Sequence, residues 1–162
     1  TYAYLHIDRD YLKAEEVISP LVEKFPGHPY FSFLKGELLA KTGKWDELER
    51  IMPKLEVFAA SGPFLKQNEC QLKLSYIRAL KAFYHGDYAV SIEKCRWMLN
   101  NYHMEFDWLN GFSYLLRGKS YDIMDKRDLA IRDYKKVLNM DEYYPEAEEA
   151  IIFLKKPFVV KN

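Results

Sequence analysis

The sequence is poor in residues that build tight turns, since its 162 residues include only 7 Gly and 7 Pro. An all-β protein of this size needs many more turn residues, so the shortage favours helices. The 2 cysteines are too few for a disulfide scaffold. Both lie at apolar positions of predicted helices, which favours buried free thiols over a bridge. No uncharged apolar run reaches about 18 residues, so no membrane span is predicted.

An excess of either charge is also missing, because 24 Lys and Arg residues balance 24 Asp and Glu residues. Binding to a nucleic-acid backbone needs a basic excess, so nucleic acid is not expected as a partner. The phosphate-loop patterns GxGxxG and GxxxxGK, the metalloprotease pattern HExxH and the nucleophile pattern GxSxG do not occur. His6 lies in the N-terminal stub, His28 in a loop, and His85 and His103 at helix ends, which favours ordinary exposed or capping histidines over catalytic ones. We therefore expect no catalytic residues, no metal and no cofactor.

Hydrophobic residues are abundant, at 49% of the chain, and 26 residues are aromatic (3 Trp, 13 Tyr and 10 Phe). Such a composition excludes a disordered chain and predicts one folded domain over residues 1–162. A short pattern recurs four times, as IDRDYLKAEEV, TGKWDELERI, HGDYAVSIEK and MDKRDLAIRD. In each copy a turn and a polar residue precede Tyr11, Trp45, Tyr88 or, in the fourth copy, Arg127.

Three positions follow these residues at fixed distances of three, seven and ten along the chain. They hold Ala14, Leu48, Ser91 and Ala130; then Ile18, Met52, Cys95 and Tyr134; then Leu21, Leu55, Met98 and Val137. This spacing marks one stripe of an α-helix. The segments before three of the turns are also predicted helices. Each carries a small residue seven positions before the turn, namely Gly36, Ala79 and Gly118, which predicts a close helix crossing.

The repeating unit is therefore a helix, a tight turn and a second helix. Its period, read at Asp10, Lys44, Asp87 and Lys126, is 34, 43 and 39 residues. The pattern resembles tetratricopeptide repeats, whose unit has about 34 residues. The fourth copy, residues 110–141, fits best, with packing residues Gly118, Tyr121, Ala130, Tyr134 and Val137. The resemblance implies an all-α, right-handed solenoid of antiparallel helix pairs.

The predicted helices cover residues 2–8, 11–25, 30–42, 45–57, 64–84, 87–101, 105–124, 127–140 and 145–156. They form an incomplete pair over residues 1–26, three pairs over 30–57, 64–101 and 105–140, and a capping helix at 145–156. The short first helix is expected to fray and to leave the next helix partly uncovered. Pro20 and Pro53 predict kinks, or an early helix end at Pro53.

The resemblance also implies that the first helix of each pair lines a concave groove that binds a peptide or a partner helix. The corresponding residues are Tyr30, Phe33, Glu37, Lys73, Tyr76, Leu80, Phe83, Phe112, Leu115, Lys119 and Asp122. We expect Tyr76 to be an exposed groove residue and Phe83 to be partly so. In the alternative interpretation these rings lie in the core, or the C-terminal tail 157–162 fills the groove.

The function expected from the resemblance is that of a non-catalytic scaffold or adaptor that binds a protein or peptide. Two alternatives remain open at this stage. One is a self-association module that forms a homo-oligomer, and the other is a helical accessory domain of a larger enzyme or of a secretion or assembly protein. The chain shows no signal peptide, which favours the cytoplasm as its compartment, although a chain that opens with Thr1 leaves the compartment open.

Overall fold

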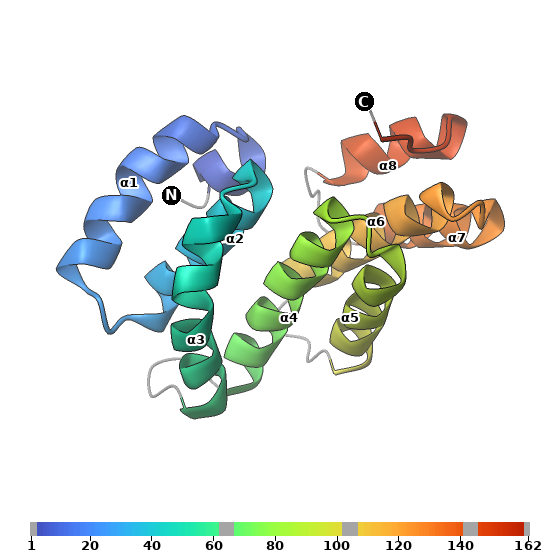
Figure 1. Ribbon diagram of the computed structural model, residues 1–162. Coiled ribbons are helices and arrows are strands. Elements are labelled where there is room, and N and C mark those ends of the chain that lie inside the picture. Colours follow the sequence, from blue (N-terminus) through green and yellow to red (C-terminus); the bar gives the residue numbers. More distant parts are fainter. Residues whose placement is uncertain (1–2, 62–66, 102–106, 141–145, 161–162) are drawn as a thin grey trace. The chain divides into compact units, whose positions relative to one another are not determined.

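The structure is a computed structural model that describes residues 3–61, 67–101, 107–140 and 146–160 (Figure 1). This part of the chain is helical and contains no strand. Its elements are η1 (Ala3–Ile7), a π-helical turn, and α1 (Tyr11–Lys24), α2 (Pro29–Thr42), α3 (Trp45–Ser61), α4 (Gln67–Tyr84), α5 (Tyr88–Asn100), α6 (Asp107–Ile123), α7 (Arg127–Leu138) and α8 (Glu146–Lys155). The all-α prediction is confirmed for the described residues.

The contacts divide the chain into two compact units, Thr1–Ile77 and Arg78–Asn162, and the boundary falls within α4. In the first unit α1 packs on α2 and α2 packs on α3. In the second unit α5 packs on α6, α6 on α7, and α8 on both α6 and α7. Neighbours along the chain are thus neighbours in space within each unit, as a helical repeat requires.

Most helix boundaries agree with the sequence prediction to within about two residues, and the N-terminal ends predicted at 2, 64, 105 and 145 lie outside the described residues. One boundary is wrong: the helix predicted over 45–57, with an early end at Pro53 as an alternative, is α3, which continues to Ser61. Proline removes one backbone hydrogen bond. Residues on both sides of it are buried, since Met52 is 9% exposed and Leu55 and Ala59 are at most 5% exposed. We infer that this packing compensates for the lost bond.

The four predicted turns share one backbone conformation. Arg9, Gly43, Gly86 and Asp125 have φ angles of 53°, 70°, 82° and 56°, and no other described residue has a positive φ. These are the residues immediately before the four positions from which the repeat period was read. The left-handed conformation ends a helix and suits glycine, which explains Gly43 and Gly86. The sequence repeat is therefore also a repeat of backbone geometry.

Hydrogen bonds at the turns repeat in the same register. In three turns the residue after the left-handed one donates its N–H to the carbonyl five residues earlier: Lys44 to Leu39 (3.0 Å), Asp87 to Ala82 (2.8 Å) and Lys126 to Tyr121 (2.9 Å). This bond is the mark of a Schellman helix end. The carbonyl of the same residue then accepts the first bond of the next helix, from Leu48, Ser91 and Ala130. Asp10 does so for Ala14.

The helical stripe predicted from the repeat forms the core. Of its twelve residues, eleven are buried and Leu21 is half-buried. In the second unit the stripe residues Ala130, Tyr134 and Val137 form a cluster with Ala150 of α8. Both cysteines are free and buried, as predicted.

Two glycines lie at close helix crossings, as their position in the repeat predicted. A methyl group added to Gly36 of α2 would lie 2.8 Å from Cδ1 of Leu55 in α3. A methyl group added to Gly118 of α6 would lie 2.5 Å from Cε1 of Tyr134 in α7. Ordinary van der Waals contact begins at about 3.5 Å. At both positions the helix therefore approaches its neighbour so closely that an added methyl group requires the contacting side chain to move.

The N-terminal stub packs more firmly than expected. Leu5 is 0% exposed and joins a cluster with Ala14, Ile18, Leu34 and Leu38. The expectation of a loose end rested on the small number of helical turns. The buried side chain of Leu5 fastens η1 to α1 and α2, which a count of turns does not predict.

Candidate functional site

The predicted groove residues of the first unit are mostly interior. Phe33 and Tyr76 are 2% and 4% exposed, Glu37 and Lys73 are also buried, and Tyr30 is half-buried. The expectation that Tyr76 is an exposed ring is therefore wrong. Its helical spacing was compatible with either a groove or a core, and in the structure the ring is in the core. A role of these residues in binding stays a prediction.

Some of these residues belong to a cluster of polar and charged side chains in the first unit. Oε1 of Glu37 forms an ion pair with the Lys41 ammonium at 2.9 Å, and Nδ1 of His6 lies 3.5 Å from the same oxygen. Nζ of Lys73 lies 4.8 Å from the ring centre of Tyr30 and 3.3 Å from Oε1 of Glu69. The cluster joins η1, α2 and α4 within the first unit.

The titration of this cluster follows from its burial. Burial lowers the pKa of His6 from 6.5 to about 4, although the Glu37 carboxylate acts in the opposite direction. Burial also works to raise the pKa of Glu37, but the charges of Lys41 and its other neighbours outweigh it, and the pKa is lowered. Near neutral pH a neutral imidazole therefore lies beside a charged carboxylate. Both groups are shielded from solvent, so this cluster supports the fold and offers no surface to a ligand.

Three of the predicted groove residues of the second unit, Phe83, Lys119 and Asp122, contact the C-terminal tail. Leu80, Phe83, Phe112, Leu115 and Asp122 are buried and Lys119 is half-buried, so the expectation that Phe83 is partly exposed is wrong. Phe158 of the tail packs on Phe83 with ring centres 5.9 Å apart, and Nζ of Lys119 lies 5.4 Å from the Phe158 ring centre. Phe158 of the tail therefore lies against predicted groove residues, while the alternative that the tail 157–162 fills the groove stays a prediction.

Asp122 fastens the tail to α6 and α7. Its carboxylate accepts two bonds from Nη1 of Arg127 at 3.0 Å, one from the Tyr134 hydroxyl at 2.8 Å and one from the backbone N–H of Phe158 at 2.8 Å. Burial and the Asp122 carboxylate raise the pKa of Tyr134, so its hydroxyl remains a donor. Nη2 of Arg127 donates to the carbonyls of Phe153 and Leu154 at 2.7 and 2.9 Å. Arg127 therefore also caps the C-terminal end of α8.

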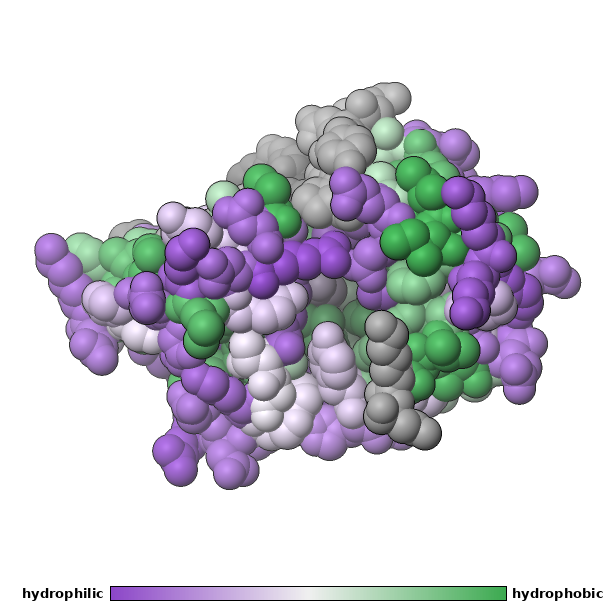
Figure 2. All heavy atoms as spheres, turned by 90° about the horizontal axis from the view of Figure 1, so that it is seen from above, coloured by the Kyte–Doolittle hydropathy of each residue, from purple (hydrophilic) through white to green (hydrophobic). Residues whose placement is uncertain are grey.

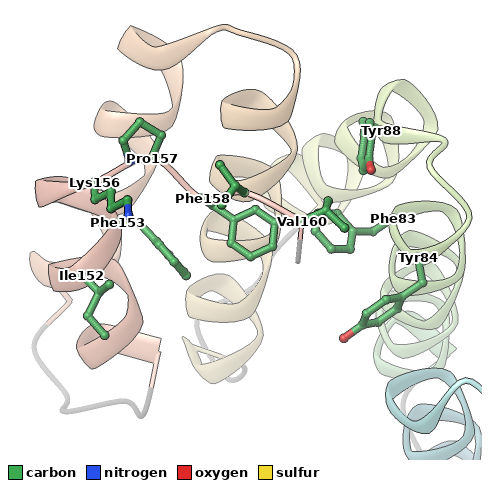
Figure 3. Close-up of a pocket in the computed structure, with 10 residues that line it drawn as sticks. Phe83, Tyr84, Tyr88, Ile152, Phe153, Lys156, Pro157, Phe158 and Val160 are labelled. Atoms are coloured by element: carbon green, nitrogen blue, oxygen red, sulfur yellow. The ribbon is translucent and has the colours of Figure 1, made fainter. Parts of the chain in front are cut away.

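An open hollow of about 660 Å³ adjoins the ring of Phe158, and we call it the C-terminal cleft (Figure 3). It is lined by Phe83, Tyr84, Tyr88, Ile152, Phe153, Lys156, Pro157, Phe158, Val159 and Val160. Figure 3 shows Phe158 between Phe153 and Phe83, and the Phe153 and Phe158 ring centres lie 5.2 Å apart, edge to face. Lys156 is the one charged residue among the ten.

The mouth of the cleft is hydrophobic. Tyr84, Ile152, Val159 and Val160 are 54%, 58%, 62% and 53% exposed. Figure 2 shows hydrophobic side chains gathered on the side of the view that holds α8. A soluble domain rarely leaves large apolar side chains exposed together unless they meet a partner. The cleft has the size and apolar lining of a ligand site.

Comparison with protein-family models, with curated proteins and with solved structures finds no match. What the cleft binds is therefore inferred from the residues that line it.

Other kinds of site find little support in the described residues. No group of three or more His, Cys, Asp or Glu side chains is placed there to hold a metal ion, and no described helix is long and apolar enough to cross a membrane. Burial raises the pKa of Cys95 to about 12, so this thiol stays protonated and is a poor nucleophile.

Several residues of the cleft were not singled out from the sequence. Phe153 and Ile152 of α8 were read only as part of a capping helix, and Phe158 only as part of a tail. One signal was present: Arg127 occupies the position where the other three copies have an aromatic ring. The structure explains the exception, because Arg127 links Asp122 to the carbonyls of α8.

Proposed function

We propose that this chain is a non-catalytic protein-interaction module of the tetratricopeptide type, and that its C-terminal cleft binds a peptide segment of a partner protein. We also propose that its helix pairs stack as a right-handed solenoid. The four turns with one backbone conformation and the buried helical stripe support this type of repeat.

One observation carries the choice of site: a hollow of about 660 Å³ that is lined by nine apolar or aromatic residues and one lysine, beside exposed Ile152 and Tyr84. Aromatic side chains anchor peptides well because they bury a large area with few rotatable bonds. The ring of Phe158 already packs between Phe83 and Phe153, which shows that an aromatic side chain fits there.

The proposal is tested by selecting binders from a displayed library of random peptides against the full chain. Affinities of the selected peptides are then measured for the wild type and for the variants Ile152→Glu and Tyr84→Glu. Both side chains are more than half exposed, so both variants should fold. A carboxylate at the mouth of an apolar cleft should weaken binding at least about tenfold, because it must lose water on binding.

Leu138→Glu is the matched control. Leu138 is an apolar residue of the same unit, 37% exposed, and it does not line the cleft. Its substitution should leave the affinity unchanged. Failure to enrich any peptide would contradict the proposal, and so would peptides that bind Ile152→Glu as tightly as the wild type.

Sedimentation velocity of the same proteins tests the alternative of self-association. A monomeric wild type supports a site that is open to a partner. A dimer that Ile152→Glu dissociates would instead identify a second copy of the chain as the occupant of the cleft.

A further inference from the structure

We infer that the tail Pro157–Val160 is an internal ligand of the C-terminal cleft, which lowers the affinity for partner peptides, and that those peptides resemble it: extended segments with an aromatic residue after a proline. This inference rests on the proposed function and names the ligand class and the regulation of the same site. It comes from the contacts of Phe158, because the tail meets the cleft in the way a bound peptide would.

The tail is held through two features that any extended peptide can offer. One is a backbone N–H, which Phe158 donates to the Asp122 carboxylate at 2.8 Å. The other is a ring, which packs on Phe153 and Phe83 and lies 5.4 Å from the ammonium of Lys119. A peptide that supplies an aromatic residue at this place makes the same contacts.

The polar anchor is preformed. Without the tail, Asp122 of α6 keeps its bonds from Arg127 and Tyr134, which both belong to α7. The carboxylate therefore stays in position to accept an N–H from another chain. Proline directly before the aromatic residue favours an extended backbone, which reduces the entropy lost when a peptide binds.

Four of the ten residues that line the cleft belong to the tail itself, so the tail occupies one side of the site and leaves the hollow beside it open. Phe158 is half-buried, while Val159 and Val160 are 62% and 53% exposed beside the open hollow. A partner peptide gains contacts with Tyr84 and Ile152 in that hollow. It must, however, replace a tail that is tethered to α8, whose effective concentration is on the order of millimolar. If the tail is seated about nine-tenths of the time, the apparent affinity for a partner falls about tenfold.

The test uses the full chain and the labelled synthetic peptide KKPFVVKN, the sequence of residues 155–162. Phe158→Ala removes the ring that seats the tail, so the peptide should bind this variant at least about tenfold more tightly than the wild type. Phe25→Ala is the matched control: Phe25 is 42% exposed and lies in the other unit, and its loss should change nothing. The same peptide with alanine in place of phenylalanine should bind neither chain.

Circular dichroism verifies the helix content of each chain, so that a gain of binding is compared between chains that are equally folded. Phe158→Leu, which keeps an apolar side chain, provides a second variant and should give an intermediate gain. Equal affinity of the peptide for the wild type and both variants would overturn the inference, as would the absence of binding to Phe158→Ala up to about 1 mM, the effective concentration of a tethered tail.

The peptides selected from the library separate this inference from the proposed function. If they bind the wild type and Phe158→Ala equally well, the cleft binds peptides and the tail does not regulate it. If no peptide is enriched against the wild type and KKPFVVKN does not bind Phe158→Ala, the proposed function is wrong as well.

Discussion

Replacement of Gly118 by alanine should destabilise the second unit, although alanine is the better helix former. Gly118 is in the interior of α6, where alanine gains about 1 kcal/mol over glycine from helix propensity alone. The added methyl group would lie 2.5 Å from Cε1 and 2.9 Å from Cδ1 of Tyr134. Such contacts are too short, so the Tyr134 ring or the α6–α7 crossing has to move.

Movement of the Tyr134 ring is costly for two reasons. The residue is 0% exposed, so the ring has no free space, and its hydroxyl is fixed by a 2.8 Å bond to Asp122. Overpacking a core costs about 1–3 kcal/mol, and a lost hydrogen bond to a charged group costs about 1.5–3 kcal/mol. After the propensity gain is subtracted, we expect Gly118→Ala to lower the free energy of unfolding by about 1.5–5 kcal/mol. Gly118→Leu should lower it further.

Gly36→Ala is the matched control. The methyl group added there would lie too close to Cδ1 of Leu55 and Cδ1 of Ile77, at 2.8 and 2.9 Å, and in ordinary contact with Cδ1 of Ile51, at 3.7 Å. These are the ends of flexible side chains, which can shift by rotation, so this variant should change stability by less than about 1 kcal/mol. Tyr134→Phe, which removes the bond to Asp122, should reduce the cost of Gly118→Ala in the double variant.

Urea unfolding followed by far-ultraviolet circular dichroism gives the free energies. A midpoint for Gly118→Ala equal to or above that of the wild type would refute the close crossing. If Gly36→Ala lowers the free energy of unfolding as much as Gly118→Ala does, the fixed position of the Tyr134 ring is not the cause of the destabilisation.

Three further predictions follow from the described contacts. The free energy of unfolding should fall by up to about 3 kcal/mol as the pH drops from 6.5 to about 4, because His6 is protonated at pKa 6.5 in the unfolded chain but only at about 4 in the folded one. In urea titrations at several pH values, His6→Gln should remove most of this pH dependence. Arg127→Met should cost about 1–3 kcal/mol in thermal unfolding because Asp122 and two α8 carbonyls lose their donor, whereas exposed Arg132→Met should cost less than about 0.5 kcal/mol. At the left-handed turn positions, Gly86→Ala should lower the free energy of unfolding by about 1 kcal/mol, and Asp125→Gly should raise it by up to about 1 kcal/mol. A urea midpoint equal to that of the wild type for either variant would contradict backbone strain at that turn.

The repeat could be predicted from the sequence because each of its features has a local cause. Gly43 and Gly86 mark left-handed turns, and the apolar residues that follow recur with the period of a helix. The close crossing at Gly118 was predictable as well, because a helix-interior glycine needs a packing reason. These signals depend on spacing along one or two helices, which a sequence displays directly.

The candidate site depends on contacts between distant segments, which spacing does not display. The bond from the Phe158 N–H to Asp122 joins residues 36 positions apart, and a backbone donor leaves no mark in the sequence. Tyr76 had the spacing of a groove ring, but the same spacing serves the core, and only tertiary packing decides between the two. His6 was expected in a loose end, yet its burial beside Glu37 depends on how η1 packs against α2.

Site-specific photo-crosslinking tests most directly whether the C-terminal cleft binds peptides. Benzoylphenylalanine is placed at position 84 of the full chain, and at position 97 as the control, since Tyr84 lines the cleft while the exposed Trp97 does not. After irradiation with a peptide selected from the library, mass spectrometry identifies the crosslinked chains. We predict crosslinks from position 84 and none from position 97, whereas crosslinks from position 97 alone, or equal yields from both, would contradict a site in the C-terminal cleft.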